Sequence, residues 1–272
     1  MPIDLTRSDG GCGEAGGRRR ALRGLCGLAL SLSPIAAPAQ AAPERELRVV
    51  GTRFERIYER QPNGEFTGMG VELVRLAAQR FGYQVRFELF PWRRAQHLVT
   101  EGAADVLVGP YKSAERLKTM RFSKQAFFQD QVAFYVRALE MPLWEGDYAA
   151  LRDRRIAILN GWSYGAAFTA ALPRLHTSVT NTVESGLQML LHSHVDLFAS
   201  NRRDTDPVVL ALGATDKLLA LAPLIDVQDG YLAYPLKPRL GALATQLDRL
   251  LEELKARGEL NRLAKKYELV LP

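Results

Sequence analysis

The stretch DVLVGPYKSAERLKTMRFS, residues 105–123, decides the predicted fold and site of this chain. Its apolar run Val106-Leu107-Val108 predicts a buried strand, which ends at the turn-forming pair Gly109-Pro110. Ser113, a favoured residue at a helix start, then precedes a short helical segment that carries Arg116. The strand is therefore expected to deliver an arginine to the carboxyl edge of a sheet, where open α/β sheets bind ligands. Taken alone, the stretch fits a surface loop with a solvated Arg-Glu pair more simply.

The residues before this strand alternate between strand and helix patterns. Apolar side chains recur with helical spacing in residues 68–81 and 91–102, and strands are expected at residues 47–50 and 84–90. The resulting β-α-β-α-β order predicts a parallel sheet with right-handed crossovers. A second α/β pattern begins after the Pro- and Gly-containing break at residues 142–147.

In this second part, a strand at residues 156–159 precedes a helix expected at 162–171. A strand at 195–199 is followed by a polar segment, residues 200–206, and residues 230–234 form a further strand before a helical tail. We therefore expect two α/β lobes around a cleft, the usual place for a small ligand.

Composition and the N-terminus restrict the class of protein. The 272 residues are 47% hydrophobic and 24% charged, as in soluble globular proteins. The formal net charge is +6, but the basic residues are mixed with acidic ones along the chain, so no nucleic-acid partner is expected. Arg18-Arg19-Arg20, an apolar stretch and Ala39-Gln40-Ala41 predict a signal peptide, residues 1–41, and a periplasmic protein without a lipid anchor. Cys12 and Cys26 both lie in this segment, so no disulfide is expected in the mature chain.

Residues Gly161-Trp162-Ser163-Tyr164-Gly165 match G-x-S-x-G, the sequence around the nucleophile of serine esterases. An esterase also needs a later histidine as base, and the last histidine, His194, stands only about thirty residues further on. The same residues fit a second interpretation, in which the start of a helix directs its N–H groups and the Ser163 hydroxyl at an anion. A helix start without a ligand is the simplest alternative.

Four aromatic residues are further candidates for ligand contact. Trp92 begins a helix beside two arginines, and Phe54, Tyr58 and Tyr111 follow strands, although core packing would explain an aromatic as well. No phosphate loop, dinucleotide fingerprint or zinc motif is present, so no cofactor is expected.

Four segments together resemble the bacterial extracellular solute-binding proteins of family 3, which serve polar amino acid uptake. These are the glycine-rich helix start at residues 64–73, the block at 104–123, Gly161-Trp162-Ser163, and the C-terminal residues 258–267. The resemblance implies an α/β clamshell of two lobes, each a mainly parallel sheet flanked by helices, joined by two hinge strands. Lobe one would comprise residues 44–136 and 230–272, and lobe two residues 137–229.

The resemblance also implies a role for individual residues. Arg116 matches the arginine that holds the carboxylate of the ligand, and a guanidinium can do so through two parallel hydrogen bonds. Gly109 and Tyr111 match ligand contacts of the same loop, and Ser163 with its neighbours matches the contact from the second lobe. Asn201 stands where the family often has an aspartate for the ligand's amino group, and an amide cannot neutralise an ammonium. Asp204, Asp206 or Glu55 could replace that aspartate.

The sequence therefore predicts a non-enzymatic, monomeric periplasmic binding protein. Its ligand would be a small polar solute with a carboxylate, and its partner the permease of an inner-membrane ABC importer. An enzyme on the same fold, similar to cyclohexadienyl dehydratase, is the alternative. Two further alternatives are a serine esterase that uses Ser163 and a ligand sensor that acts on a signalling receptor.

Overall fold

The computed structural model describes residues 45–140, 142 and 144–272. The predicted signal peptide and both cysteines lie outside these residues. The strands are β1 (Glu46–Gly51), β2 (Glu59–Arg60), β3 (Phe66–Thr67), β4 (Gln84–Leu89), β5 (Val106–Tyr111), β6 (Met120–Phe122), β7 (Phe128–Arg137), β8 (Arg155–Leu159), β9 (His176–Thr180), β10 (Leu197–Asn201), β11 (Leu218–Ala220) and β12 (Asp226–Pro235). The α-helices are α1 (Met69–Phe81), α2 (Trp92–Thr100), α3 (Ala166–Ala171), α4 (Val183–Leu191), α5 (Arg202–Ala211), α6 (Leu243–Ala256) and α7 (Glu259–Lys266). Short 3₁₀ turns are η1 (Arg116–Lys118), η2 (Tyr148–Leu151) and η3 (Leu172–Arg174).

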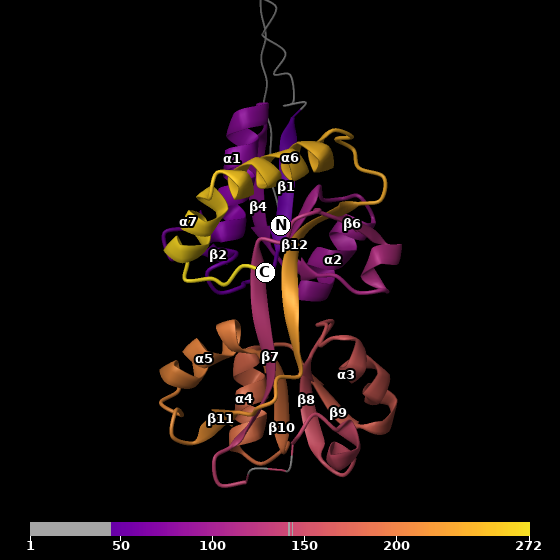
Figure 1. The fold of residues 1–272 in the computed structure, drawn as a ribbon, viewed down its shortest axis with the longest axis vertical. Helices are drawn as coiled ribbons and strands as arrows, with labels where there is room; N and C mark the ends of the chain where they lie inside the picture. Colours follow the sequence, from indigo (N-terminus) through magenta and orange to yellow (C-terminus); the bar gives the residue numbers. More distant parts are fainter. Residues whose placement is uncertain (1–44, 141, 143) are drawn as a thin grey trace, which may run out of the picture. The chain divides into compact units, whose positions relative to one another are not determined.

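Two long strands connect two α/β lobes (Figure 1). The strands run in the order β4-β1-β5-β12-β7-β10-β8-β9. In lobe one β1 pairs in parallel with β4 and β5, and in lobe two β8 pairs in parallel with β10 and β9. Between them β12 and β7 pair antiparallel, with Asp226 opposite Val132 and Gly230 opposite Phe128. This is the two-lobed α/β architecture with two hinge strands that the sequence predicts.

Each lobe has its own hydrophobic core. In lobe one α1 and α6 bury apolar faces that include Leu73 and Leu247 against the sheet. In lobe two, clusters on the two faces of the sheet centre on Phe134 and Phe198. Burying one such side chain contributes about 1.5–3 kcal/mol, so each lobe can hold its own shape.

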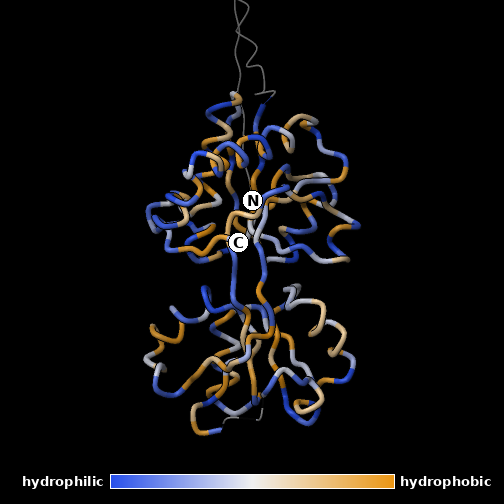
Figure 2. Tube along the Cα trace, viewed as in Figure 1, coloured by the Kyte–Doolittle hydropathy of each residue, from blue (hydrophilic) through white to orange (hydrophobic). Residues whose placement is uncertain are grey.

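The segments that join the lobes are polar instead. Figure 2 shows mostly hydrophilic residues where the two strands pass from one lobe to the other, and the sequence there reads Gln129-Asp130-Gln131 on β7. The core clusters of the two lobes lie on either side of this polar stretch, and Trp162 packs against both of them. The boundaries that the sequence gives for the lobes stay a prediction.

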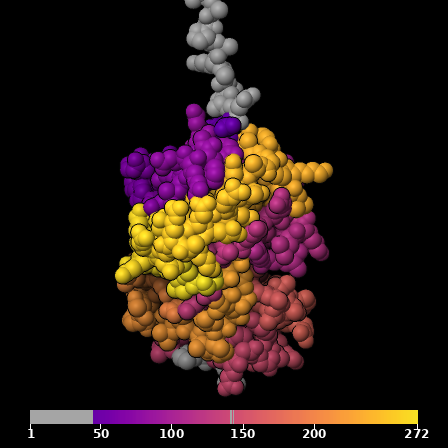
Figure 3. All heavy atoms as spheres, turned by 45° about the horizontal axis from the view of Figure 1, so that its top comes forward, coloured from indigo at the N-terminus to yellow at the C-terminus, as the bar shows by residue number. Residues whose placement is uncertain are grey.

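The C-terminal residues lie on lobe one and reach the hinge. Figure 3 shows them in yellow over one face of the molecule, and a β-bridge joins Val270 to Gln129 of β7.

In the described residues, no helix combines the length and the apolar character that crossing a bilayer requires.

Most predicted strands and helices are confirmed, with two corrections near the site. The helix expected from residue 162 begins only at Ala166, because Gly165 adopts a φ of 90° that ends the preceding loop. The polar segment 200–206 is helical from Arg202 onward, because the Asn201 side chain accepts a hydrogen bond from the Asp204 N–H and caps α5. The short strands β2, β3, β6 and β11 were not predicted.

Candidate ligand-binding site

The loop after β5 places Arg116 at the junction of the two lobes. Gly109 has a φ of 88°, and a Cβ there would come within 3.0 Å of the Phe54 ring, so only glycine fits without strain. Further along, the Ser113 hydroxyl accepts a hydrogen bond from the Arg116 N–H at 3.2 Å, which starts the turn η1. The chain reverses here, and the Arg116 guanidinium donates to the carbonyl of Tyr111, the last residue of β5.

The Arg116 guanidinium is buried among neutral acceptors. The residue is only 8% exposed, and its hydrogen-bond acceptors are the Gln96 side-chain oxygen at 3.1 Å and the carbonyls of Tyr111 and Gly161, both at 2.9 Å. In the part of the chain that the structure describes, no carboxylate lies within 4.0 Å of its nitrogens. Burial therefore lowers the pKa of Arg116 to about 10. A buried cation without a charged partner is costly, and an anionic ligand would remove that cost.

The Gly161 carbonyl of lobe two lies against this cation. Besides the bond from Arg116, it accepts hydrogen bonds from the Trp92 indole N–H at 3.1 Å and from the Gln96 amide at 3.4 Å. Gly161 has a φ of 74°, which turns its carbonyl toward lobe one. Three donors thus converge on one oxygen, as they would on a carboxylate oxygen of a solute.

A small cavity of about 10 Å³ lies beside these donors. Both lobes supply its walls, with Trp162 and Ser163 coming from lobe two. Seven of the ten residues predicted as ligand contacts line it: Phe54, Trp92, Gly109, Tyr111, Arg116, Trp162 and Ser163. The structure therefore brings together residues that are up to about a hundred positions apart in the sequence.

The remaining three predicted residues lie outside the cavity lining. Gly161 contacts Arg116 through its carbonyl only. Asn201 lies behind Tyr111 and donates a hydrogen bond to its hydroxyl at 3.1 Å. Tyr58 is 0% exposed and belongs to the core of lobe one, where its hydroxyl donates to the Val49 carbonyl at 2.9 Å. This placement corrects the prediction of a ligand contact for Tyr58.

A second arginine, Arg203 of α5, was not predicted from the sequence, and its guanidinium carbon lies 5.7 Å from the ring centroid of Phe54, which lines the cavity. Its side chain is 8% exposed, and its Nε and Nη2 donate to the two oxygens of Asp130 at 2.9 and 2.8 Å. Its Nη1 donates to Asp204 Oδ1 and to the Glu55 carbonyl, each at 2.7 Å. Asp130 comes from the hinge strand β7, so this network ties lobe two to the hinge and to lobe one. No local pattern signals such a pair, because 73 residues separate the partners.

Opposing influences act on the charges of this network. Burial lowers the pKa of Arg203, but the carboxylates of Asp130 and Asp204 outweigh burial and raise it. Burial raises the pKa of Asp204, and Arg203 lowers it in part. Burial and then the Asp130 carboxylate raise the pKa of the Tyr111 hydroxyl, which donates to Asp130 at 2.6 Å. The arginine and both aspartates therefore form a charged, fully hydrogen-bonded cluster.

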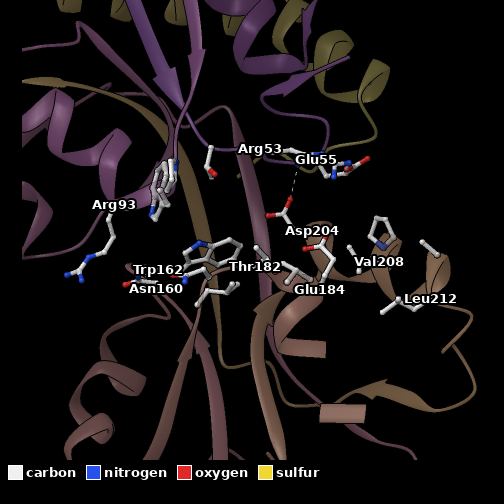
Figure 4. Close-up of a pocket in the computed structure, with 18 residues that line it drawn as sticks. Arg53, Glu55, Arg93, Asn160, Trp162, Thr182, Glu184, Asp204, Val208 and Leu212 are labelled. Atoms are coloured by element: carbon white, nitrogen blue, oxygen red, sulfur yellow. Dashed lines mark hydrogen bonds and ion pairs between the residues drawn. The ribbon is translucent and has the colours of Figure 1, made fainter. Parts of the chain in front are cut away.

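A larger groove of about 920 Å³ opens beside the small cavity. Figure 4 shows Arg53 and Glu55 of lobe one on one side and Thr182 and Glu184 at the start of α4 on the other. A hydrogen bond of 2.9 Å from the Glu55 N–H to Asp204 crosses from one lobe to the other inside it. The groove shares Trp92 and Trp162 with the small cavity, so the two are adjoining parts of one interlobe region.

The structure does not assemble a serine nucleophile or a metal centre from the described residues. No histidine or carboxylate among them hydrogen-bonds to Ser163, so the base that an activated serine needs is missing from this arrangement. His192 and His194 lie with ring centroids 6.1 Å apart, but no group of three or more potential metal ligands forms in the described part of the chain.

The comparisons with known proteins agree with this architecture. Residues 49–269 match the family described as bacterial extracellular solute-binding proteins, family 3. No curated protein matches the chain.

Solved structures share the fold at low sequence identity. A histidine kinase sensor domain with similarity to periplasmic binding proteins superposes with a TM-score of 0.74 at 21% identity, covering 85% of this chain and 99% of that one. The substrate-binding protein of an amino acid ABC transporter gives 0.68 at 17% identity, covering 82% and 98%. The ancestral amino-acid-binding protein AncCDT-1, a precursor of cyclohexadienyl dehydratase, gives 0.65 at 18% identity, covering 82% and 94%.

Proposed function

Because the chain belongs to the bacterial extracellular solute-binding proteins, family 3, we propose that it captures a small polar solute with a carboxylate group between its lobes. The solute is an amino acid or a related organic acid. One observation carries this proposal: Arg116 is a buried cation whose hydrogen-bond acceptors are all neutral. A solute carboxylate that took the place of the Gly161 carbonyl would accept the hydrogen bond from Arg116 Nη2 and neutralise the guanidinium charge.

The other predicted contacts fit around such a solute. Phe54 and Trp92, whose ring centroids lie 5.0 Å apart, form an apolar wall of the cavity, and Ser163 of lobe two lines the same cavity. Because the Gly161 carbonyl of lobe two already accepts a hydrogen bond from Arg116, a carboxylate reaches this guanidinium when the lobes separate, and the lobes then close again around the solute. The hinge strands themselves are polar, so the apolar contact between the lobes that has to open is that of Trp162 with Phe54, whose ring centroids lie 5.8 Å apart.

The proposal includes the setting of the protein. Residues 1–41 direct it to the periplasm as a cleaved signal peptide, and it works as a monomer that passes its solute to the permease of an ABC importer. Uptake of the labelled solute should be lost in a strain without this protein. Normal uptake together with a lost transcriptional response would favour a sensor instead.

A thermal-shift screen of the mature protein, residues 42–272, tests the binding function. Amino acids, organic acids and polyamines are compared, because a ligand that binds only the folded protein raises its melting temperature. We expect hits only among compounds with a carboxylate. Arg116→Ala should abolish these hits, whereas Lys118→Ala, which changes an exposed residue of the same turn, should keep them. Equal hits in both variants would contradict the assignment of Arg116.

A second candidate function, an enzyme similar to cyclohexadienyl dehydratase, has one observation in its favour. Glu55 and Asp204 line the larger groove, and burial raises the pKa of both, which suits a carboxyl that donates a proton. Incubation with cyclohexadienyl carboxylates and ultraviolet detection of an aromatic product decides between the two functions. Turnover that disappears in Glu55→Gln would establish the enzyme, and binding without turnover would support the solute-binding protein.

A further inference from the structure

The guanidinium of Arg203 is a second cation near the cavity of Arg116, because it contacts the ring of Phe54, which lines that cavity. Its guanidinium donates four hydrogen bonds, all to protein acceptors, and its partners Asp130 and Asp204 have side chains that are only 1% and 9% exposed. The guanidinium carbon also lies 5.7 Å from the ring centroid of Phe54 and 5.3 Å from that of Phe128. Two carboxylates and two aromatic faces are the surroundings that bind an organic cation. The chain fills these surroundings with its own side chain.

This cation shares its walls with the predicted solute site. Phe54 lines the small cavity and also covers the Arg203 guanidinium. Tyr111 lines the cavity and donates from its hydroxyl to Asp130, the main partner of Arg203. Phe54 and Tyr111 therefore connect the cavity to the Arg203 network. A solute in the cavity of Arg116 would therefore share the walls Phe54 and Tyr111 with the Arg203 network.

A solute with an ammonium group next to its carboxylate would meet two obstacles here. The carboxylates of Asp130 and Asp204 are already paired with Arg203, so neither of them is free to bind the ammonium. It would also lie close to a like charge in a buried site, which is unfavourable. Asn201 cannot help, because its side-chain oxygen accepts the Asp204 N–H and its amide donates to Tyr111 and Asp204.

We propose that Arg203 determines specificity by filling the cation half of the interlobe site with its own guanidinium. The protein then selects organic acids that lack an α-amino group and rejects amino acids. This inference rests on the proposed solute-binding function and narrows its solute class.

Removal of the side chain tests the inference. In Arg203→Ala, the carboxylates and aromatic faces should accept a free cation, so methylguanidinium should raise the melting temperature by about 3 °C or more at ten times its Kd. Wild type should show no such rise at equal ionic strength. Arg202→Ala, which removes the adjacent but exposed arginine, should behave as wild type. Equal responses of Arg203→Ala and wild type to methylguanidinium would overturn the inference.

Two further measurements cover the case in which Arg203→Ala does not fold. The double variant Arg203→Ala/Asp130→Asn removes one charge of each sign, and it should still gain stability from methylguanidinium through Asp204. Its failure to gain would count against the cation half. In wild type, calorimetry should show at least about tenfold weaker binding of an amino acid than of the 2-hydroxy acid with the same side chain, a factor that corresponds to about 1.4 kcal/mol. Equal or tighter binding of the amino acid would overturn the inference.

These outcomes separate the inference from the proposed function. If neither an amino acid nor another organic acid binds wild type, the proposed function fails, while a methylguanidinium response of Arg203→Ala would still establish the cation half. If organic acids bind through Arg116 but amino acids bind as well, only the inference fails.

Discussion

Arg116 and Arg203 lie at the same junction between the lobes, both bury their guanidinium groups, and they differ in what neutralises them. Each is about 8% exposed, Arg116 as a residue and Arg203 by its side chain. Burial lowers the pKa of Arg116 to about 10, whereas for Arg203 the effect of burial is outweighed by Asp130 and Asp204, which raise its pKa. Burial alone therefore does not identify a ligand-binding arginine. Arg116 has no carboxylate partner among the described residues, so an anionic solute can bind to it and neutralise its charge.

Replacing each arginine by methionine should separate the two roles most strongly. Arg203→Met leaves two buried carboxylates without their cation and should lower the free energy of unfolding by about 3–5 kcal/mol. Arg116→Met removes a buried charge without stranding a carboxylate, so the ligand-free protein should change by no more than about 1 kcal/mol. Urea unfolding at neutral pH measures both. Equal losses in the two variants would erase the distinction.

The pH dependence of the Arg203→Met variant should sharpen this contrast. Burial already raises the pKa of Asp204 above 3.8, and removing Arg203 removes the strongest influence that lowers it. A carboxyl whose pKa is higher in the folded protein stabilises the fold at low pH and loses this contribution as the pH rises through the folded pKa. The deficit of the variant should therefore shrink from about pH 8 to about pH 5, by at most about 1.4 kcal/mol per pH unit for each proton bound. A deficit that is constant over this range would show that Asp204 does not take up the proton.

Asn201→Asp should have a smaller effect, and one opposite to what the sequence suggests. From sequence alone, this change restores the aspartate of the family and should improve amino acid binding. In the structure it would place a carboxylate 3.0 Å from Asp204 Oδ2, in the position of a donated hydrogen bond. We expect a loss of about 1–3 kcal/mol in stability and no gain in amino acid affinity. Calorimetry that shows tighter amino acid binding would restore the sequence-based interpretation.

Gln96→Ala should have the smallest effect on the Arg116 side of the comparison. It removes one neutral acceptor of the guanidinium and one donor to the Gly161 carbonyl, so affinity for a carboxylate should fall by about 0.5–1.5 kcal/mol, up to roughly tenfold. His97→Ala alters the adjacent, exposed residue of α2 and serves as the control. A loss in Gln96→Ala as large as that in Arg116→Ala would show that Gln96 itself contacts the solute.

Local patterns were sufficient to predict most of the fold. The apolar run 106–108, the helical spacing of residues 68–81 and the glycines between elements each act over a few residues, so they can be read from sequence. The start of α3 was misplaced because the loop Gly161–Gly165 depends on backbone angles that its sequence does not reveal. The hinge was recognised through the family resemblance, since pairing of β7 with β12 joins residues about a hundred positions apart.

The candidate site was predicted less completely. Arg116 and its loop could be proposed because the family motif lies in one stretch. Tyr58 was misjudged because an aromatic after a strand gives no sign of whether it faces solvent, and here it fills the core. Arg203 looked like one charge in a polar segment, and only the tertiary structure brings Asp130 within 2.9 Å of it.

The unneutralised charge of Arg116 is the central claim, and one calorimetric comparison tests it most directly. The organic acid that gives the largest thermal shift is titrated into wild type beside its primary amide, which has the same shape without the charge. The account predicts that the acid binds at least about a hundredfold more tightly than the amide, a difference of about 2.7 kcal/mol, and that Arg116→Met abolishes this preference. Equal affinities for acid and amide in wild type, or an unchanged preference in Arg116→Met, would contradict it.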